Sequence, residues 1–238
     1  MKDSILKYLY VFVFILVSFA PRYQGEDFRQ AFGHDYKKAD EWMRENYSDF
    51  KSKAVVYGIP VRKLQAIVFP EIIRYNAVYD FIETTALSLL YVESGNRYAD
   101  FSIGCFQMKP SFAEQIEEEA EELLTANICQ QLGFSGLMIP DTKENREARI
   151  TRLSSLEGQL QYLLAFYMIC ELKLKDEKFN NETDRLRLLA TSYNSGYNEP
   201  ISEIRSAMKK KEFYTGKFIT SSRYNYSDIS VFWYNDSQ

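Results

Sequence analysis

The sequence predicts a mainly α-helical protein with little or no β structure. Its 238 residues include only 10 glycines and 6 prolines, and a chain this poor in turn residues, against a usual share of roughly 12%, favours helices. Hydrophobic residues make up 46% of the chain, which is enough to bury a substantial core. Apolar residues between positions 156 and 174 recur every three or four residues, the spacing of one helix face.

The first 20 residues predict an export signal or a short N-terminal anchor. Lys2 and Lys7 precede an apolar run from Tyr8 to Ala20. This run is shorter than the roughly 20 residues that span a bilayer, and it matches the apolar region of a secretory signal. Pro21 disfavours cleavage at the small residues before it, so a retained membrane tether is one alternative and a buried N-terminal helix another. We therefore expect an exported protein of the periplasm or cell envelope.

Turn signals divide the rest of the chain into a series of expected elements. Glycine and proline mark the ends of helices, because each disfavours the helical hydrogen-bond pattern. Pro70 lacks a backbone donor and is expected to interrupt its helix. The expected elements are a surface helix at 35–57 ending at Gly58, within an N-terminal helical extension at 21–57; a helix at 60–74; an apolar helix at 78–93; a loop or short strands at 96–109; a helix starting near Phe112; a surface excursion at 133–150; and helices at 156–174 and 184–194.

The helix expected near Phe112 is rich in acidic residues. Ser111 and Glu114 have the spacing of a capping box at its start. Its glutamates either form a cation site or cover a solvated helix face, and we interpret them as a solvated face. They are Glu114, Glu117, Glu118, Glu119, Glu121 and Glu122.

Composition argues against several classes of site. A formal net charge of −4 disfavours a basic face for nucleic acid. The single histidine, His34, disfavours a multi-histidine metal centre and leaves little room for a Ser-His-Asp triad. We expect no metal and no cofactor. The cysteines Cys105, Cys129 and Cys170 are either three buried apolar residues or include a Cys129–Cys170 disulfide formed in an oxidising compartment.

Three short segments combine a carboxyl group in an apolar setting with amide and hydroxyl side chains. Glu71 lies in an apolar helix, the segment Gly-Cys-Phe-Gln-Met-Lys-Pro-Ser follows at 104–111, and Ser-Tyr-Asn-Ser-Gly comes at 192–196. An apolar setting raises the pKa of a carboxyl group. A carboxyl that is protonated near neutral pH can donate its proton to a glycosidic oxygen. The alternative for Glu71 is an ion pair with Arg74 on a surface turn.

In their order and character these segments resemble the soluble lytic transglycosylases and the goose-type lysozymes, over roughly residues 58–198. The resemblance implies a lysozyme-like α-helical domain at 58–238 that ends in an aromatic-rich segment. It also implies that Glu71 is the catalytic acid and base. The residues that it implies in substrate binding or in support of Glu71 are Gly104, Gln107, Met108, Tyr193 and Asn194.

The same resemblance implies an enzyme that binds peptidoglycan strands and cleaves the β-1,4 bond between MurNAc and GlcNAc, leaving a 1,6-anhydro end. One alternative is a muramidase hydrolase, in which Asp100 supplies a second carboxylate, with Glu83 and Glu93 as weaker candidates. Asp100 also suits a turn or cap. A further alternative is a non-catalytic relative that binds glycan or scaffolds an envelope complex.

The chain departs from the family pattern in two places. Ile72 stands where a serine usually follows the catalytic glutamate, and Glu71 and Gly104 lie 33 positions apart, more than the family's usual connection. The apolar helix at 78–93 accounts for the excess and either reshapes the groove or holds a partner. The tail aromatics either line a sugar groove or cover the core; they are Tyr214, Phe218, Tyr224, Tyr226, Phe232, Trp233 and Tyr234.

Overall fold

The fold is mainly α-helical, as predicted. The computed structural model describes residues 26–77, 81–134, 141–215 and 222–236, so the predicted export segment at 1–20 lies outside the described residues. Within them there are twelve α-helices and one short 3₁₀ helix, and the only β pairing is two isolated bridges. The helices are α2 (Phe28–Phe32), α3 (His34–Glu45), α4 (Tyr47–Ala54), η1 (Val55–Tyr57), α5 (Val61–Ala77), α6 (Phe81–Ser94), α7 (Pro110–Leu123), α8 (Ala126–Gln131), α9 (Lys143–Leu153), α10 (Leu156–Lys173), α11 (Glu182–Ser195), α12 (Ile201–Ala207) and α13 (Tyr226–Asp236).

Local sequence signals fix where several helices begin and end. The Ser155 hydroxyl accepts a hydrogen bond from the Gly158 N–H at the start of α10, and the Asn181 side chain does the same for Asp184 at the start of α11. These N-caps satisfy backbone donors that have no partner inside the helix. Gly58 follows η1 with φ of 65°, a left-handed conformation that glycine adopts without steric cost.

Helix α5 runs through Pro70, so the expected interruption there is wrong. A proline inside a helix removes one hydrogen bond and costs about 3 kcal/mol in an isolated helix. In this chain α5 packs against α3, α11 and α13, and Leu64, Ile67 and Phe69 are fully buried. Burial of each such side chain contributes about 1.5–3 kcal/mol, so tertiary packing outweighs the proline.

Helix α7 begins at Pro110, and the expected capping box does not form. The Ser111 backbone N–H and hydroxyl both donate to Asp100, at 3.0 and 2.9 Å. Glu114 instead accepts a hydrogen bond from the Tyr91 hydroxyl at 2.7 Å. Asp100 therefore caps α7 from outside the helix, and Glu114 is free to join α7 to α6.

The surface excursion expected at 133–150 is also wrong in its second half, because α9 occupies it. Thr142 caps α9 through the Asn145 N–H, and Arg149 and Leu153 on this helix are buried. The segment has few apolar residues, so its sequence did not indicate a helix. One of the side chains that α9 buries is the charged Arg149. Residues 135–140 lie outside the described part of the chain.

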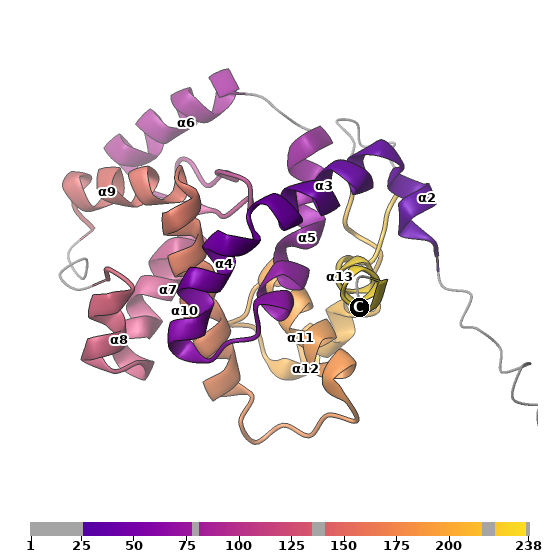
Figure 1. Cartoon of the computed structure of the whole chain (residues 1–238). Coiled ribbons are helices and arrows are strands. Elements are labelled where there is room, and N and C mark those ends of the chain that lie inside the picture. The colour runs from indigo at the N-terminus through magenta and orange to yellow at the C-terminus, as the bar shows by residue number, and fades with distance from the viewer. Residues whose placement is uncertain (1–25, 78–80, 135–140, 216–221, 237–238) are drawn as a thin grey trace, which may run out of the picture.

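Two helices form the centre of the molecule (Figure 1). Helix α10 is buried on most sides and packs against α4, α7, α9 and α11, while α5 packs against α3, α11 and α13. The expected inward residues of α10 are confirmed, since Leu160, Leu163 and Cys170 are all at most 3% exposed. The N-terminal helices α3 and α4 contribute to the same core, which extends from Phe28 to Trp233.

Helix α6 lies at the edge of this arrangement (Figure 1) and packs mainly on α9. It is the apolar helix expected at 78–93, shifted by a few residues. Tyr91 and Val92 on α6 form a second, smaller core with Ala99. In the described ranges no helix is long and apolar enough to cross a membrane.

The tail aromatics mostly cover the core. Tyr226 and Trp233 are buried, and Tyr224, Phe232 and Tyr234 pack partly buried against the core. Tyr214 differs, because 36% of it is exposed. Phe218 lies outside the described residues.

The three cysteines are free thiols, so the Cys129–Cys170 disulfide does not form in this structure. Cys170 is buried, while Cys105 and Cys129 are partly buried.

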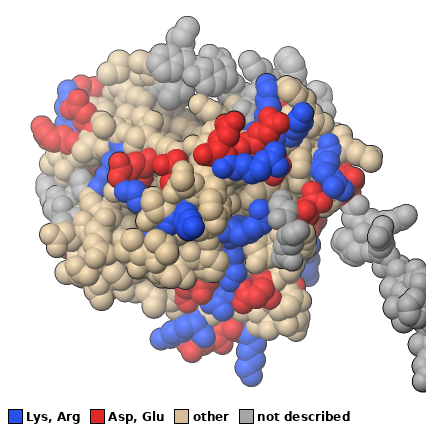
Figure 2. Space-filling model, in the orientation of Figure 1, with Lys and Arg blue, Asp and Glu red and all other residues tan. Residues whose placement is uncertain are grey.

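The face drawn in Figure 2 carries acidic and basic side chains next to one another, with no broad field of one charge.

Candidate active site

Glu71 is a buried carboxylic acid in the middle of α5. Only 5% of the residue is exposed, and its neighbours Ile67 and Ile72 are buried as well. The Oε2 atom is buried and has no hydrogen-bond partner among the described residues. The nearest cation is the Arg74 guanidinium, whose Nη1 lies 3.7 Å from Oε2. The two residues are therefore neighbours, as one alternative expected, but they do not form an exposed pair on a surface turn.

Burial sets the acidity of this group. Loss of solvent around the carboxylate raises the pKa of Glu71 from about 4.5 to about 7, and the nearby Arg74 charge only partly opposes this effect. An unpartnered buried carboxylate oxygen is costly in its charged form, which also favours the protonated acid. Glu71 can therefore hold a proton near neutral pH, as a general acid must.

Tyr193 joins α11, which packs against α5, to the segment at 104–111. Its hydroxyl, on α11, donates to the Phe106 carbonyl oxygen at 2.8 Å. Burial raises the pKa of Tyr193, and the Glu71 carboxylate raises it further. The hydroxyl of Tyr193 therefore lies within electrostatic reach of Glu71. The structure brings together all three segments that the sequence singled out.

Residues 103–108 form a tight β-hairpin turn beside Tyr193. Ile103 and Met108 exchange backbone hydrogen bonds at 2.9 and 3.1 Å. The Gln107 side-chain amide donates to the Gly104 carbonyl oxygen at 2.9 Å, and Gln107 has φ of 50°. Its amide nitrogen therefore stabilises the turn. Met108 is 2% exposed and belongs to the core, where it supports the turn from beneath.

Gly104 is required by packing within the protein. It has φ of 68°, and a Cβ atom there would lie 1.7 Å from Gln159 Nε2 and 2.7 Å from the Leu153 carbonyl oxygen. The resemblance implied a role for this glycine in substrate binding or in support of Glu71, and the structure shows that it lets the turn approach α10.

Gln159 is a supporting residue that sequence reasoning did not single out. Its Oε1 accepts from the Phe106 N–H at 2.7 Å, and its Nε2 donates to the Leu153 carbonyl oxygen at 2.7 Å. Gln159 is 1% exposed. The available signal was an amide side chain facing inward on an otherwise apolar helix, and such a group needs hydrogen-bond partners when it is buried.

Tyr226 was named from the sequence only as one of the tail aromatics, and its hydrogen bond to α5 was not predicted. Its hydroxyl, on α13, donates to the Ile67 carbonyl oxygen at 2.9 Å, one helical turn before Glu71. Burial raises the pKa of Tyr226, and the Glu71 carboxylate adds to this effect. Helices α5, α11 and α13 thus each contribute a polar side chain to one buried region.

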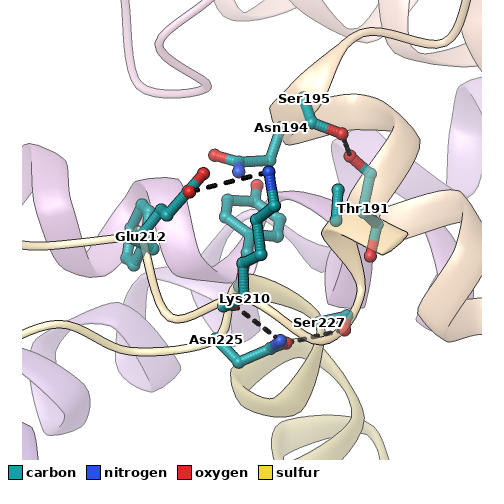
Figure 3. Close-up of a pocket in the computed structure, with 10 residues that line it drawn as sticks. Thr191, Asn194, Ser195, Lys210, Glu212, Asn225 and Ser227 are labelled. Carbon is teal, nitrogen blue, oxygen red and sulfur yellow. Dashed lines mark hydrogen bonds and ion pairs between the residues drawn. The ribbon is translucent and has the colours of Figure 1, made fainter. Parts of the chain in front are cut away.

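Asn194 lines a pocket between α11 and the start of α13 (Figure 3). Asn194 is exposed, and the pocket also includes Lys210, Asn225 and Tyr226. Its interior volume is about 30 Å³, which is room for one or two water molecules. Figure 3 shows Lys210 paired with Glu212. The Asn225 side chain donates to the Lys210 carbonyl oxygen and accepts from the Ser227 hydroxyl.

The proposed second carboxylates are occupied elsewhere. Both oxygens of Asp100 accept from Ser111, and Asp100 also lies 3.8 Å from the Lys109 ammonium. Glu93 pairs with Lys143 on the surface. The side chain of Glu83 lies outside the described residues.

Comparisons of the chain with protein-family models, with curated proteins and with solved structures find no match.

Proposed function

We propose that this protein is a peptidoglycan lytic transglycosylase with a lysozyme-like fold, and that Glu71 is its acid and base. The observation that carries the proposal is the buried Glu71 carboxyl, whose pKa of about 7 suits proton transfer at neutral pH. The order of the three sequence segments and their convergence on Tyr193 support it.

The proposed reaction uses one carboxyl group twice. Protonated Glu71 donates its proton to the glycosidic oxygen between MurNAc and GlcNAc, and the C1–O bond breaks. The resulting carboxylate then accepts the proton of the C6 hydroxyl on the same MurNAc, while the C6 oxygen bonds to C1. The 1,6-anhydro product forms without water, and Glu71 ends protonated, as it began.

The hydrolase alternative has less support. A hydrolase of this kind normally adds a second carboxylate that activates water or attacks C1. Asp100, the leading candidate for that role, is engaged by the Ser111 backbone and hydroxyl at the start of α7. A non-catalytic scaffold is also less favoured. A buried carboxyl with a raised pKa lowers the stability of the fold at neutral pH and above, and groups of this kind are typical of functional sites.

Peptidoglycan lies outside the cytoplasmic membrane, so the proposal requires export to the periplasm or cell envelope. The apolar run at 8–20 supports it as a signal or tether. Cell fractionation of the native protein is expected to recover it from the envelope, and recovery mainly from the cytosol would contradict an exported enzyme. Partners in an envelope complex are a further part of the proposal.

The decisive test is the product and its dependence on two carboxyl groups. Wild-type protein is expected to release anhydro-muramoyl ends from purified cell wall, each lighter by one water than a reducing end in mass spectrometry. Glu71→Gln is expected to lower the rate by a factor on the order of 10² or more, because glutamine cannot transfer the proton. Asp100→Asn is expected to cost far less.

Glu118→Gln, on the exposed side of α7, is the matched control and is expected to cleave at the wild-type rate. Reducing ends from the wild-type protein, with severe losses in both Glu71→Gln and Asp100→Asn, would favour the hydrolase. Normal cleavage by Glu71→Gln would exclude both mechanisms at this site.

A further inference from the structure

An exposed aromatic ring lies close to Glu71 on a short two-stranded bridge. Phe213 and Tyr224 exchange backbone hydrogen bonds at 3.0 and 2.7 Å, so the next residues, Tyr214 and Arg223, stand opposite each other. Neighbouring residues on a strand point to opposite faces. Phe213 is buried, with its ring edge-on to Tyr226 at 5.1 Å between centroids, and Tyr214 accordingly projects outward.

Two arginines lie against the Tyr214 ring. The Arg223 guanidinium carbon is 4.5 Å from the ring centroid, which is a close cross-strand cation–π contact. The Arg74 guanidinium carbon is 5.9 Å from the same centroid. Because Arg74 also lies 3.7 Å from Glu71 Oε2, Arg74 links the Tyr214 ring and Arg223 to the candidate catalytic acid.

The positive charge of this cluster is poorly neutralised within the described residues. The carboxylate nearest to Arg74 is Glu71, which the proposed mechanism uses in its protonated, uncharged form. Arg223 is exposed, and its Nη1 donates to a backbone carbonyl oxygen, that of Glu212, at 3.0 Å. A carbonyl satisfies a donor without cancelling its charge. The cluster therefore offers two cations and an aromatic face to a bound molecule.

We propose that Arg74, on α5, and Arg223, opposite Tyr214 on the two-stranded bridge, form a subsite that binds a carboxylate on the sugar next to the cleaved bond. This inference rests on the proposed glycan-cleaving function. Guanidinium groups bind carboxylates through paired, charge-assisted hydrogen bonds. The exposed Tyr214 ring gives the sugar an apolar surface to lie against. The subsite would select muramoyl glycans over neutral polymers of N-acetylglucosamine, which have the same β-1,4 bond and N-acetyl groups but no carboxylate.

The carboxylate has two sources in peptidoglycan. In a glycan without peptides it is the lactyl group of MurNAc, and in an intact strand that group is bound in an amide and the stem peptide supplies the charge. Both present the same chemistry to the arginines. Binding of peptide-free and peptide-bearing muramoyl tetrasaccharides, compared directly, identifies which source the subsite holds more tightly.

The experiment measures binding without cleavage, in the full-length Glu71→Gln variant. Isothermal titration calorimetry compares two ligands of equal length, a tetrasaccharide of alternating GlcNAc and MurNAc, which carries carboxylates, and a neutral tetrasaccharide of GlcNAc alone. We expect tighter binding of the muramoyl ligand. Adding Arg223→Gln is expected to weaken that binding about fivefold, the scale of one partly exposed ion pair, and to leave the GlcNAc ligand unaffected. Adding Arg97→Gln, at an exposed arginine of another loop, is the matched control and is expected to change neither affinity.

Equal affinity for the two tetrasaccharides, binding of neither, or an Arg223→Gln effect of the same size on both would overturn the subsite. Arg223 is chosen for the variant because Arg74 lies 3.7 Å from the side chain of residue 71, so that its loss would also disturb the catalytic position. The two proposals fail separately. Cleavage by the wild-type protein without any preference for muramoyl ligands contradicts only the subsite. Preferential binding by a wild-type protein that cleaves neither ligand contradicts only the catalytic proposal.

Discussion

Burial of Glu71 links the candidate chemistry to the stability of the fold. The pKa of this carboxyl is about 7 in the folded protein against about 4.5 for an ordinary glutamate, so between these pH values the folded chain holds a proton that the unfolded chain has released. The free energy of unfolding then falls as pH rises. The contribution is complete below about pH 4.5 and lost above about pH 7, and the difference corresponds to about 3 kcal/mol.

Glu71→Gln removes this pH dependence, because glutamine stays neutral. We expect the variant to be more stable than the wild type at pH 8 and of similar stability at pH 4.5, as measured by urea unfolding at both values. Glu118→Gln, at an exposed carboxyl, is expected to follow the wild-type curve. A wild-type curve parallel to that of Glu71→Gln would mean that Glu71 titrates normally in the folded protein.

Gly104 allows a second prediction at this scale. Gly104→Ala is expected to lower the free energy of unfolding by about 2–4 kcal/mol, since it combines left-handed backbone strain with a collision against Gln159. Gly58→Ala is the matched control, because Gly58 has nearly the same φ, 65°, and nothing within 4 Å of the added Cβ. It is expected to cost about 1 kcal/mol. Equal losses in thermal or urea unfolding would show that the turn shifts away from α10 without difficulty.

The setting of Glu71 could be predicted from the sequence because its apolar neighbours are also its neighbours along the chain. The role of Gly104 could not, because Gln159 lies 55 positions away and no local pattern pairs the two. The hydrogen bond from Tyr226 to Ile67 could not be predicted either, since the two residues are 159 positions apart in the sequence. One turn of helix is readable from spacing, whereas a contact between helices depends on the packed fold.

The glutamates of α7 show the same limit at the scale of an element. Glu118 is exposed as expected, but Glu117 is 4% exposed, so the solvated-face interpretation is wrong for it. Both guanidinium donors Nε and Nη2 of Arg149 bind Glu117 Oε2, at 3.0 and 2.5 Å, and the Tyr162 hydroxyl donates to Oε1. Arg149 also bonds Tyr91. Helices α6, α7, α9 and α10 are thereby joined through one buried ion pair.

Breaking this pair is expected to be severe. Glu117→Gln removes the carboxylate closest to the buried Arg149 cation and leaves only Glu114, at 3.2 Å, to pair with it. The variant is expected to cost about 3 kcal/mol in urea unfolding, the lower end for a broken buried pair. The neighbouring change Glu118→Gln is the control and is expected to stay within about 0.5 kcal/mol of the wild type. The double variant Glu117→Leu with Arg149→Met is expected to cost less than Glu117→Gln alone, because the two most buried charges leave together and the more exposed Glu114 keeps the Tyr91 hydroxyl as a donor. A small loss in Glu117→Gln would mean that water reaches Arg149.

For the whole molecule, the free thiols predict a stability that does not depend on redox conditions. A Cys129–Cys170 disulfide would close a loop of about 40 residues and be worth about 3–4 kcal/mol in the chain-entropy model. With both thiols free, adding reductant is expected to leave the melting temperature unchanged. Three thiols are expected to react with a thiol reagent after unfolding without reductant. A fall of several degrees on reduction would indicate that the disulfide forms in solution.

The sequence predicted the helical class of the molecule because composition and helical spacing are averages over many residues. It did not predict how α6 and α9 pack against each other at the edge. That packing depends on the hydrogen bond between Arg149 and Tyr91, two residues that are 58 positions apart in the sequence. The convergence of α5, α11 and the 103–108 turn was predicted only through the resemblance of three short segments.

The burial of α10 on most sides has a consequence for how the protein fluctuates. Its central amides can exchange with solvent only when the whole fold opens, because neighbouring helices cover them. Helix α6, which packs mainly on α9, can detach at a smaller cost. The turn beside Tyr193 is fastened to α10 through Gln159, and so the candidate site rests on the part of the molecule that opens last. Local detachment of α6 therefore does not displace the turn at 103–108.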